Sequence, residues 1–159
     1  MSTDTQDNPG VIAPPPLIYV GGVALGLLLH RLLPIKFLAR IPRGITLTVG
    51  STCVSMGLTV LVSGFRQMTN AQTNVNPTYP ATTIVTEGPF RFTRNPLYLS
   101  MTLLYIGITF LVNTLWLVLL LPIVLVLINI GVIAREERYL ERKFGAQYLA
   151  YKQRVRRWL

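Results

Sequence analysis

Two short polar segments of the sequence hold the side chains that could carry chemistry. In the first, Arg94, Asn95 and Pro96 stand directly before an apolar run that starts at Leu97. Asn is a favoured helix N-cap and Pro is favoured at the first helical position, so this order can simply begin a helix, with Arg94 anchored to a lipid phosphate. The same helix start would offer free N–H groups and a positive dipole end, which suit a carboxylate. The two interpretations are compatible.

The second segment opens with two adjacent acids, Glu136 and Glu137, which directly follow another apolar run. Adjacent acids among arginines commonly form a solvated face of ion pairs. A carboxylate is also the usual partner of ribose hydroxyls in nucleotide-like cofactors, and it would favour a cationic ligand such as a sulfonium. Both interpretations remain open from the residues alone.

Residues that bind metals or form disulfides are nearly absent. His30 is the only histidine and Cys53 is the only cysteine. His30 has no second histidine with which to share a metal, and Cys53 has no disulfide partner. We therefore expect no metal site, and we interpret His30 as an interfacial residue and Cys53 as a small core residue.

The composition places most of the chain in lipid. Of the 159 residues, 51% are apolar and 13% are charged, and the mean hydropathy is +0.48. An ordinary soluble domain is about one quarter charged. Each crossing of a hydrocarbon core needs about 20 mostly apolar residues. The sequence predicts an all-α polytopic membrane protein with about four transmembrane helices in one membrane-embedded domain, residues 17–159. We expect the spans at about residues 17–33, 45–65, 97–112 and 115–134.

The connections between the spans fit this fold. Residues 67–83 are polar and rich in Asn and Thr, and they predict a loop at the membrane surface because hydrocarbon would leave their backbone groups unsatisfied. Asn113 and Thr114 form so short a connection that the last two spans should be an antiparallel hairpin. Pro122 should kink the second arm of this hairpin or help to open a cavity beside it.

The two ends of the chain differ in character. Residues 1–16 predict a disordered tail that lacks the positive n-region of a cleaved signal peptide and ends in three prolines. After Ala134, apolar residues recur every three or four positions among many basic ones, which predicts a C-terminal amphipathic interfacial helix that Gly145 could interrupt. The small residues Gly21, Gly22 and Gly26 could serve either a dimer or packing within the chain. The sequence does not select an oligomeric state.

The basic residues indicate the orientation. The net charge of +9 lies between and after the apolar runs, so membrane lipids explain it better than nucleic acid does. With four spans, both termini and the loop after the second span share one side, which holds all but four of the 15 Lys and Arg residues. The positive-inside rule places that side in the cytoplasm. We expect the segments 82–98 and 135–157, at the two feet of the hairpin, to meet there.

Two longer stretches carry a recognisable pattern. Residues 86–100 are TEGPFRFTRNPLYLS, with a Gly-Pro-aromatic turn followed by Arg-Asn-Pro-x-Tyr. Residues 136–158 are EERYLERKFGAQYLAYKQRVRRW, with paired glutamates, Phe-Gly, two spaced tyrosines and Arg-Val. In this order and separation they resemble the isoprenylcysteine carboxyl methyltransferase and phospholipid methyltransferase group of membrane-integral enzymes. The resemblance covers about half of the chain, since the first half is similar only in being apolar.

The resemblance implies a methyl transfer from S-adenosylmethionine to a lipid-soluble acceptor. It implies that the following residues bind this cofactor: Thr82, Thr83, Ile84, Val85, Phe90, Asn95, Pro96, Leu97, Tyr98, Glu136 and Glu137. Our candidates for orienting the reacting groups are Arg94, Asn95 and Tyr98. Membrane lipids and a small lipid-soluble acceptor are the expected partners, because four short helices leave no soluble domain to recognise a protein.

Three residues depart from the pattern of these enzymes. Asn95 stands where the group has a histidine, which removes a titratable imidazole and keeps hydrogen-bonding capacity. Ser100 replaces a glycine and should still permit close helix approach. Val132 stands where prenylcysteine carboxyl methyltransferases resemble one another in having an arginine for the substrate carboxylate, which argues against carboxyl methylation in particular.

Two other functions stay open. Membrane sterol and enone reductases resemble this group in their Arg-x-Pro-x-Tyr region but use NADPH, and they are generally much longer chains. A non-enzymatic membrane scaffold with a basic lipid-binding tail would also explain the C-terminal segment, although it would leave the motifs at the hairpin feet unexplained. The acceptor is also open and ranges over a phospholipid amine, a hydrophobic thiol or carboxylate, and a small membrane-soluble metabolite.

Overall fold

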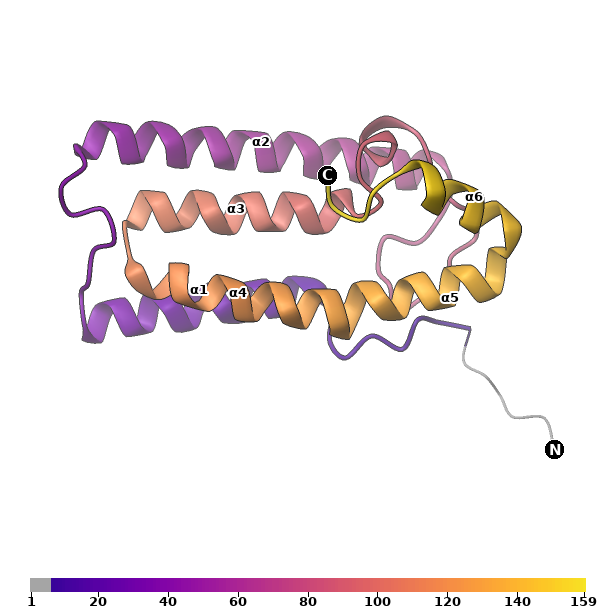
Figure 1. Ribbon diagram of the computed structural model, residues 1–159, viewed down its shortest axis with the longest axis horizontal. Helices are drawn as coiled ribbons and strands as arrows, with labels where there is room; N and C mark the ends of the chain where they lie inside the picture. Colours follow the sequence, from indigo (N-terminus) through magenta and orange to yellow (C-terminus); the bar gives the residue numbers. More distant parts are fainter. Residues whose placement is uncertain (1–6) are drawn as a thin grey trace.

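The computed structural model describes residues 7–159, and the protein is helical throughout its ordered elements (Figure 1). Its helices are α1 (Pro15–Leu32), α2 (Arg43–Asn70), α3 (Pro96–Val112), α4 (Leu115–Ile128), α5 (Ala134–Phe144) and α6 (Ala146–Arg154). A 3-10 turn, η1 (Gly88–Arg91), precedes α3, and a π-helical segment, η2 (Asn129–Ile133), joins α4 to α5. No strand occurs in the described residues, so the predicted all-α fold is confirmed.

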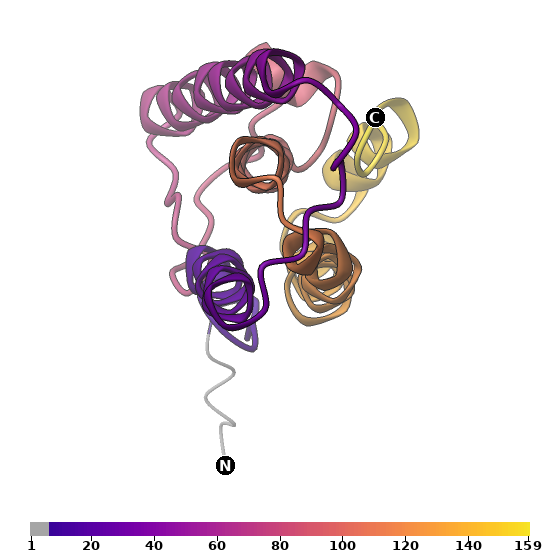
Figure 2. The ribbon, with the colours of Figure 1, turned by 90° about the vertical axis from the view of Figure 1, so that its left-hand side faces the viewer.

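The chain is an integral membrane protein. By length and composition, the segments Pro15–Leu32, Arg43–Asn70 and Leu115–Phe144 can each cross a membrane. The remaining apolar helix, α3, has 17 residues. A view along the helices shows α3 between α2 on one side and α1 and α4 on the other (Figure 2). This central place accounts for the many buried residues of α3, which its neighbours cover on several sides.

Glycines bring the helices into close contact. Gly50, Gly57 and Gly64 recur every seventh residue on α2, and all three are buried against α3. A Cβ atom added to Gly50 would lie 2.8 Å from Leu111 Cδ2 and 3.0 Å from the carbonyl oxygen of Gly107. Because only glycine permits this approach, α2 fixes the position of α3 along its whole length.

The small residues of α1 are used for packing within the chain. A Cβ atom on Gly22 would lie 2.6 Å from Val124 Cγ2, and one on Gly26 would lie 2.3 Å from Leu117 Cδ2. Both contacts are with α4, whereas Gly21 has nothing within 4 Å of the corresponding position. Of the two roles that the sequence left open, the structure therefore supports packing within the chain for Gly22 and Gly26.

The hairpin of α3 and α4 follows the prediction at Asn113 and Thr114. Asn113 ends α3 in the left-handed conformation, with φ of 55°, and its side chain exchanges two hydrogen bonds with the backbone of Leu38, at 3.0 and 3.2 Å. Thr114 caps α4 by accepting a hydrogen bond from Trp116 N. Pro122 lies inside α4. The hairpin returns the chain to the end of the bundle from which α3 started.

One predicted boundary was wrong. The loop expected at residues 67–83 begins only after Asn70, because α2 continues beyond its apolar run and packs on η1; a Cβ atom on Gly88 would lie 2.9 Å from Gln67 Cγ. The amphipathic segment begins where it was predicted, with α5 at Ala134, and α5 continues α4 through η2 as one rod (Figure 1). It breaks at Gly145, whose φ of 49° favours glycine, and α6 then turns back.

In place of the disordered tail predicted for residues 1–16, residues 7–14 lie along η2 and α5, and α1 begins at Pro15. Ile12 N donates to the carbonyl oxygen of Gly131 at 3.2 Å, and Arg135 Nη1 donates to the carbonyl oxygen of Gly10 at 2.7 Å. Residues 1–6 of that prediction lie outside the described residues. The N-terminal segment is thus part of the folded structure from Asp7 onward.

The two isolated residues considered for metal or disulfide chemistry lie apart from each other. His30 is half-buried in the last turn of α1, and Cys53 is half-buried in α2. Within residues 7–159, no group of three His, Cys, Asp or Glu side chains is placed to hold a metal ion.

Candidate functional site

A pocket lies where the two feet of the hairpin meet, at the end of the bundle that also carries the described N-terminal segment. It has a cavity volume of about 130 Å³ within a hollow of about 860 Å³ that includes its opening to solvent. Its walls come from the end of α2, the loop after α2, the start of α3, and α5 and α6. The hairpin therefore brings together segments 82–98 and 135–157, as expected from the predicted topology.

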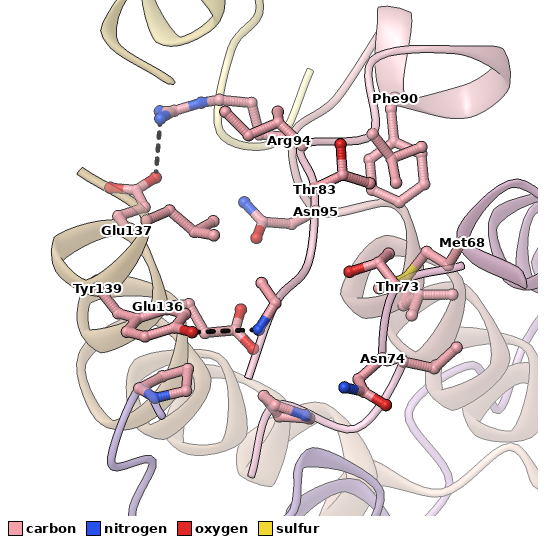
Figure 3. Close-up of a pocket in the computed structure, with 18 of the residues that line it drawn as sticks. Met68, Thr73, Asn74, Thr83, Phe90, Arg94, Asn95, Glu136, Glu137 and Tyr139 are labelled. Atoms are coloured by element: carbon pink, nitrogen blue, oxygen red, sulfur yellow. Dashed lines mark hydrogen bonds and ion pairs between the residues drawn. The ribbon is translucent and has the colours of Figure 1, made fainter. Parts of the chain in front are cut away.

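The pocket collects most of the candidate residues. Those that line it are Thr83, Ile84, Val85, Phe90, Arg94, Asn95, Pro96, Leu97, Tyr98, Glu136 and Glu137. In Figure 3, the side chains of Asn95 and Glu136 approach the same space from opposite walls. Thr82 is the candidate that does not line the pocket. Its Oγ1 donates to the carbonyl oxygen of Gln72 at 2.8 Å and so fixes the loop from outside.

A short hydrogen bond joins the two feet inside the pocket. Tyr98 Oη, on the first turn of α3, donates to Glu136 Oε1, near the start of α5, at 2.5 Å. The two residues are 38 positions apart in the chain. Its length is at the short end of the range for hydrogen bonds between hydroxyl and carboxyl oxygens. This bond holds a carboxylate at the pocket wall in a defined orientation.

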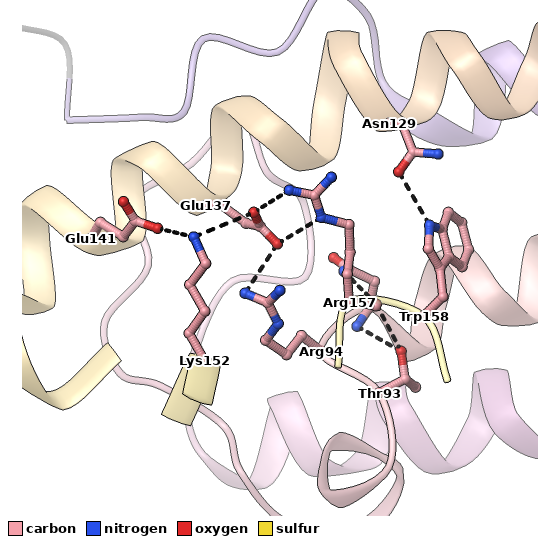
Figure 4. A network of polar contacts seen from close by, with 9 residues as sticks. Thr93, Arg94, Asn129, Glu137, Glu141, Lys152, Arg157 and Trp158 are labelled. Atoms are coloured by element: carbon pink, nitrogen blue, oxygen red, sulfur yellow. Dashed lines mark hydrogen bonds and ion pairs between the residues drawn. The ribbon is translucent and has the colours of Figure 1, made fainter. Parts of the chain in front are cut away.

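Glu137 is a buried carboxylate and not part of a solvated face. Its side chain is 6% exposed, and Arg157 contacts it with two nitrogens, Nε to Oε1 at 3.0 Å and Nη2 to Oε2 at 2.6 Å (Figure 4). Arg94 Nη1 lies 3.1 Å from Oε1 and Lys152 Nζ lies 3.9 Å from Oε2. Three cations therefore surround one acid, and Glu136 is left as the carboxylate that faces the pocket without an ion pair.

Asn95 occupies the predicted N-cap position of α3, but its side chain does not cap the helix. Instead, Asn95 Nδ2 donates to the carbonyl oxygen of Arg157 at 2.9 Å. Thr93 Oγ1 donates to the same oxygen at 3.1 Å, and Arg94 N donates to the carbonyl oxygen of Arg156 at 2.9 Å. The Asn95 side chain therefore bonds to the C-terminal segment and does not cap α3. This contact holds the start of α3 in place.

The C-terminal end also contributes a tryptophan that the sequence pattern only indicated as apolar. Trp158 packs against the hydrophobic core, and its Nε1 donates to Asn129 Oδ1 in η2 at 3.1 Å (Figure 4). Val132, in the same π-helical segment, is fully buried in this core. The position at which the sequence resemblance implied an arginine is therefore apolar in its surroundings as well as in its side chain.

The N-terminal segment forms a part of the pocket that sequence reasoning missed. Pro9 lines it, and Asp7 accepts hydrogen bonds from Tyr139 Oη at 2.9 Å and from Lys143 Nζ at 2.6 Å. The bond from Lys143 lowers the pKa of Asp7. Tyr139 Oη in turn accepts from Ala81 N at 3.1 Å, which ties the loop to the same cluster. An aspartate in a polar tail gives no local signal of such a role.

Further lining residues that were not predicted are Met68 at the end of α2 and, in the loop that follows, Thr73, Asn74, Val75, Pro77, Tyr79 and Ala81. The loop folds over the pocket through its own hydrogen bonds. Asn74 Nδ2 donates to the carbonyl oxygen of Pro80 at 2.7 Å, and Thr82 N donates to Thr73 Oγ1 at 3.1 Å. The Asn-rich and Thr-rich composition of this loop was the available signal, since such side chains bond to nearby backbone.

Comparison with known proteins shows the family. The family model described as phospholipid methyltransferase matches residues 45–147. The chain belongs to this family. It is therefore a membrane methyltransferase. An uncharacterised protein of Haemophilus influenzae is 51% identical over 65 residues, which are 40% of this chain and the whole of that protein. No solved structure gives a significant match.

The matched region contains the first foot of the hairpin and the beginning of the second, with Arg94, Tyr98 and Glu136. Two parts of the pocket lie outside it. One is the N-terminal segment with Pro9, and the other is the C-terminal stretch after residue 147, with Tyr148 and Tyr151. This member of the phospholipid methyltransferase family thus completes its pocket with residues from both ends of the chain.

Proposed function

We propose that this protein transfers a methyl group from S-adenosylmethionine to a lipid-soluble acceptor, and that the pocket between α2, α3 and α5 holds the cofactor. The observation that carries the proposal is the hydrogen bond between Tyr98 and Glu136. It joins the two segments that resemble methyltransferases and holds a carboxylate beside an apolar wall. We further propose that this end of the bundle faces the cytosol, where the cofactor is available.

The residues of the pocket fit such a cofactor. The carboxylate of Glu136 can accept hydrogen bonds from ribose hydroxyls and favours a positively charged sulfur nearby. Ile84, Val85 and Phe90 give an apolar surface for a base. The first turn of α3 offers backbone N–H groups that no helical carbonyl can reach. When bound, the cofactor would supply a methyl group already activated by its sulfonium.

With an activated methyl group, the protein needs to supply alignment and exclusion of water more than acid-base chemistry. Correct orientation of reactants can contribute roughly 7 to 11 kcal/mol to lowering a barrier. Asn95 and Tyr98 are held rigidly for this purpose, because Asn95 is bonded to the C-terminal backbone and Tyr98 to Glu136. The substitution of histidine by Asn95 is compatible with this chemistry, since no proton has to be taken by that side chain.

Among the acceptors that the sequence left open, a phospholipid amine has the best support. The chain belongs to the phospholipid methyltransferase family. Val132 is fully buried in an apolar core and offers no charge to a substrate carboxylate. Met68 and Leu97 line the pocket at the ends of two apolar helices, α2 and α3, so a lipid can reach it along apolar surface.

The test is isothermal titration of the detergent-purified protein with S-adenosylhomocysteine, with NADPH as a parallel ligand. We expect saturable binding of S-adenosylhomocysteine only, and a loss of at least about tenfold in affinity in Glu136→Ala, the effect of one lost charge-assisted hydrogen bond. Glu87→Ala is the matched control, because the side chain of Glu87 is 70% exposed and lies outside the pocket.

Other outcomes would redirect the assignment. Binding of NADPH in place of S-adenosylhomocysteine would support a reductase. No binding of either ligand by a folded protein would favour the scaffold hypothesis. Equal affinity of the parent and Glu136→Ala for S-adenosylhomocysteine would show that the cofactor lies elsewhere.

A further inference from the structure

We propose that Arg94 and Tyr148 form an oxyanion subsite at one end of the pocket, which binds a carboxylate or phosphate group of a bound molecule. This inference rests on the proposed function and deepens it, because it names a chemical group that the ligands must carry. Both residues line the pocket.

The first argument is the state of the Arg94 side chain. It is 8% exposed, so its charge is almost completely removed from water. Among residues 7–159, its buried Nε and Nη1 have no hydrogen-bond partner, and the 3.1 Å contact of Nη1 with Glu137 is an ion pair without hydrogen-bond geometry. Buried donors are normally satisfied. A planar guanidinium with free donors that faces a pocket is suited to a carboxylate or phosphate.

The second argument is the distribution of charge around Glu137. Its two oxygens are taken by the two nitrogens of Arg157. Lys152 is balanced by Glu141, to which it donates at 2.5 Å. Arg94 therefore shares an acid that Arg157 already neutralises, and the cluster of three cations and two acids carries an excess positive charge. Arg94 is the buried cation of this cluster, and an anionic group in the pocket would compensate its charge where water has little access.

The third argument is that the neighbouring groups are donors held in place. Burial raises the pKa of Tyr148 to about 12 against the opposing effect of the neighbouring Arg94 cation, and the hydroxyl stays protonated at neutral pH. Tyr148 is 3% exposed, and its ring packs edge-on against Tyr151 at a centroid distance of 6.2 Å. Tyr151 Oη donates to the carbonyl oxygen of Phe90 at 2.7 Å, and Arg94 N is bonded to Arg156. The subsite is therefore rigid before a ligand binds.

Two molecules can supply the oxyanion. One is the cofactor, through the carboxylate of its amino-acid end, and the other is a lipid acceptor, through its phosphate. Attachment of Arg94 to headgroups at the outer surface, the structural interpretation of the sequence, does not fit a side chain that is 8% exposed. The chemistry is the same for the two molecules, and the experiment separates them.

The experiment compares the parent with Arg94→Gln and Arg94→Lys. Arg91→Gln is the matched control, because Arg91 lies in η1, three residues away, and its side chain is 65% exposed. Binding of S-adenosylhomocysteine is measured beside 5′-methylthioadenosine, a thioether nucleoside without the carboxylate. The Michaelis constant is measured for vesicles of phosphatidylethanolamine. Thermal unfolding is measured in inorganic phosphate and in chloride at equal ionic strength.

If the subsite holds the cofactor, Arg94→Gln lowers the affinity for S-adenosylhomocysteine by about tenfold or more and leaves the affinity for 5′-methylthioadenosine almost unchanged, so most of the parent's preference for the first ligand is lost. If it holds the lipid, that preference is retained and the Michaelis constant for the lipid rises by about tenfold. Either result supports the subsite. Arg94→Lys keeps the charge beside Glu137. It should show the same change in ligand affinity or Michaelis constant as Arg94→Gln, with a smaller loss of thermal stability.

The subsite is overturned if Arg94→Gln and Arg94→Lys change neither the preference nor the Michaelis constant. It is also overturned if they weaken the two nucleosides equally, because that result indicates a structural role alone. The phosphate measurement does not depend on the cofactor. We expect phosphate to raise the unfolding temperature of the parent and of Arg91→Gln but not of Arg94→Gln. If the parent binds no nucleoside, the proposed function fails, and this measurement alone decides the subsite.

Discussion

The side chain of Glu137 is 6% exposed and lies between the guanidinium groups of Arg94 and Arg157. Burial of a carboxylate is costly unless cations and hydrogen bonds compensate it. Here the compensation comes from the C-terminal segment, whose backbone also accepts hydrogen bonds from Thr93 and Asn95. A single acid thus connects the end of the chain to the start of α3, where the candidate residues of the pocket lie.

At this scale we predict that Glu137→Gln lowers the free energy of unfolding by about 3 kcal/mol, because it leaves the buried Arg94 without an opposite charge and removes the acid that Arg157 contacts. The change should appear as a lower midpoint of thermal unfolding in detergent, followed by the fluorescence of Trp116 and Trp158. Glu87→Gln removes an ion pair whose side chains are 65% and 70% exposed, and it should change the free energy by less than about 1 kcal/mol. Equal midpoints for the two variants would contradict the prediction.

Helix α3 carries Asn95, Pro96 and Tyr98 into the pocket, and its position is set by contact with α2. The glycines of α2 let the two backbones approach so closely that the carbonyl oxygen of Gly50 would lie 2.9 Å from a Cβ atom on Gly107. Without water between helices in the membrane, such close packing is a main source of helix association. The geometry of the pocket therefore depends on a contact near the other end of α3.

We predict that Gly107→Ala destabilises the protein by about 1 to 3 kcal/mol, the usual effect of overpacking a tight contact. The added Cβ atom would meet Val54 Cγ2 at 2.6 Å and backbone atoms of Gly50 and Val54 at 2.9 and 3.0 Å, which cannot move aside as a side chain can. Affinity for S-adenosylhomocysteine should fall with stability. Gly21→Ala is the control, because nothing lies within 4 Å of its Cβ position. Unchanged unfolding of Gly107→Ala would show that α2 and α3 are less tightly packed.

One end of the helix bundle carries the pocket and the polar segments, and the other end carries only connections between helices. The described N-terminal residues, the loop over the pocket, and α5 and α6 gather at one end of the bundle, and the connections from α1 to α2 and from α3 to α4 lie at the other (Figure 1). The net charge of +9 is concentrated at the pocket end, because only Arg31, Lys36, Arg40 and Arg43 belong to the other end. This asymmetry is the physical basis for proposing that the pocket faces the cytosol.

Orientation can be measured with single cysteines. In a Cys53→Ser background, which removes the only native cysteine, we predict that a membrane-impermeant maleimide labels Ala39→Cys in intact cells and labels Thr78→Cys only after the membrane is opened. Both positions are exposed, and they lie in connections at opposite ends of the bundle. The reverse pattern would place the pocket outside the cytosol.

The local sequence determined the elements and much of the pocket. Apolar runs fixed the four apolar helices, Asn113 and Thr114 fixed the hairpin, and Gly145 fixed the break between α5 and α6, because each of these depends on neighbouring residues. Since a hairpin must return the chain to its starting side, the topology also brought segments 82–98 and 135–157 together. Ten of the eleven cofactor candidates accordingly line one pocket.

Only the tertiary structure decided what each side chain contacts. Thr82 lies outside the pocket and Glu137 is buried. Asn95 bonds to a residue 62 positions away and does not cap α3. The tertiary structure also brought in Asp7, which bonds to Tyr139 across 132 residues. Such contacts join segments whose local composition is independent of one another. Their energies depend on burial and on the distance between charges, and both arise only when the whole chain has packed.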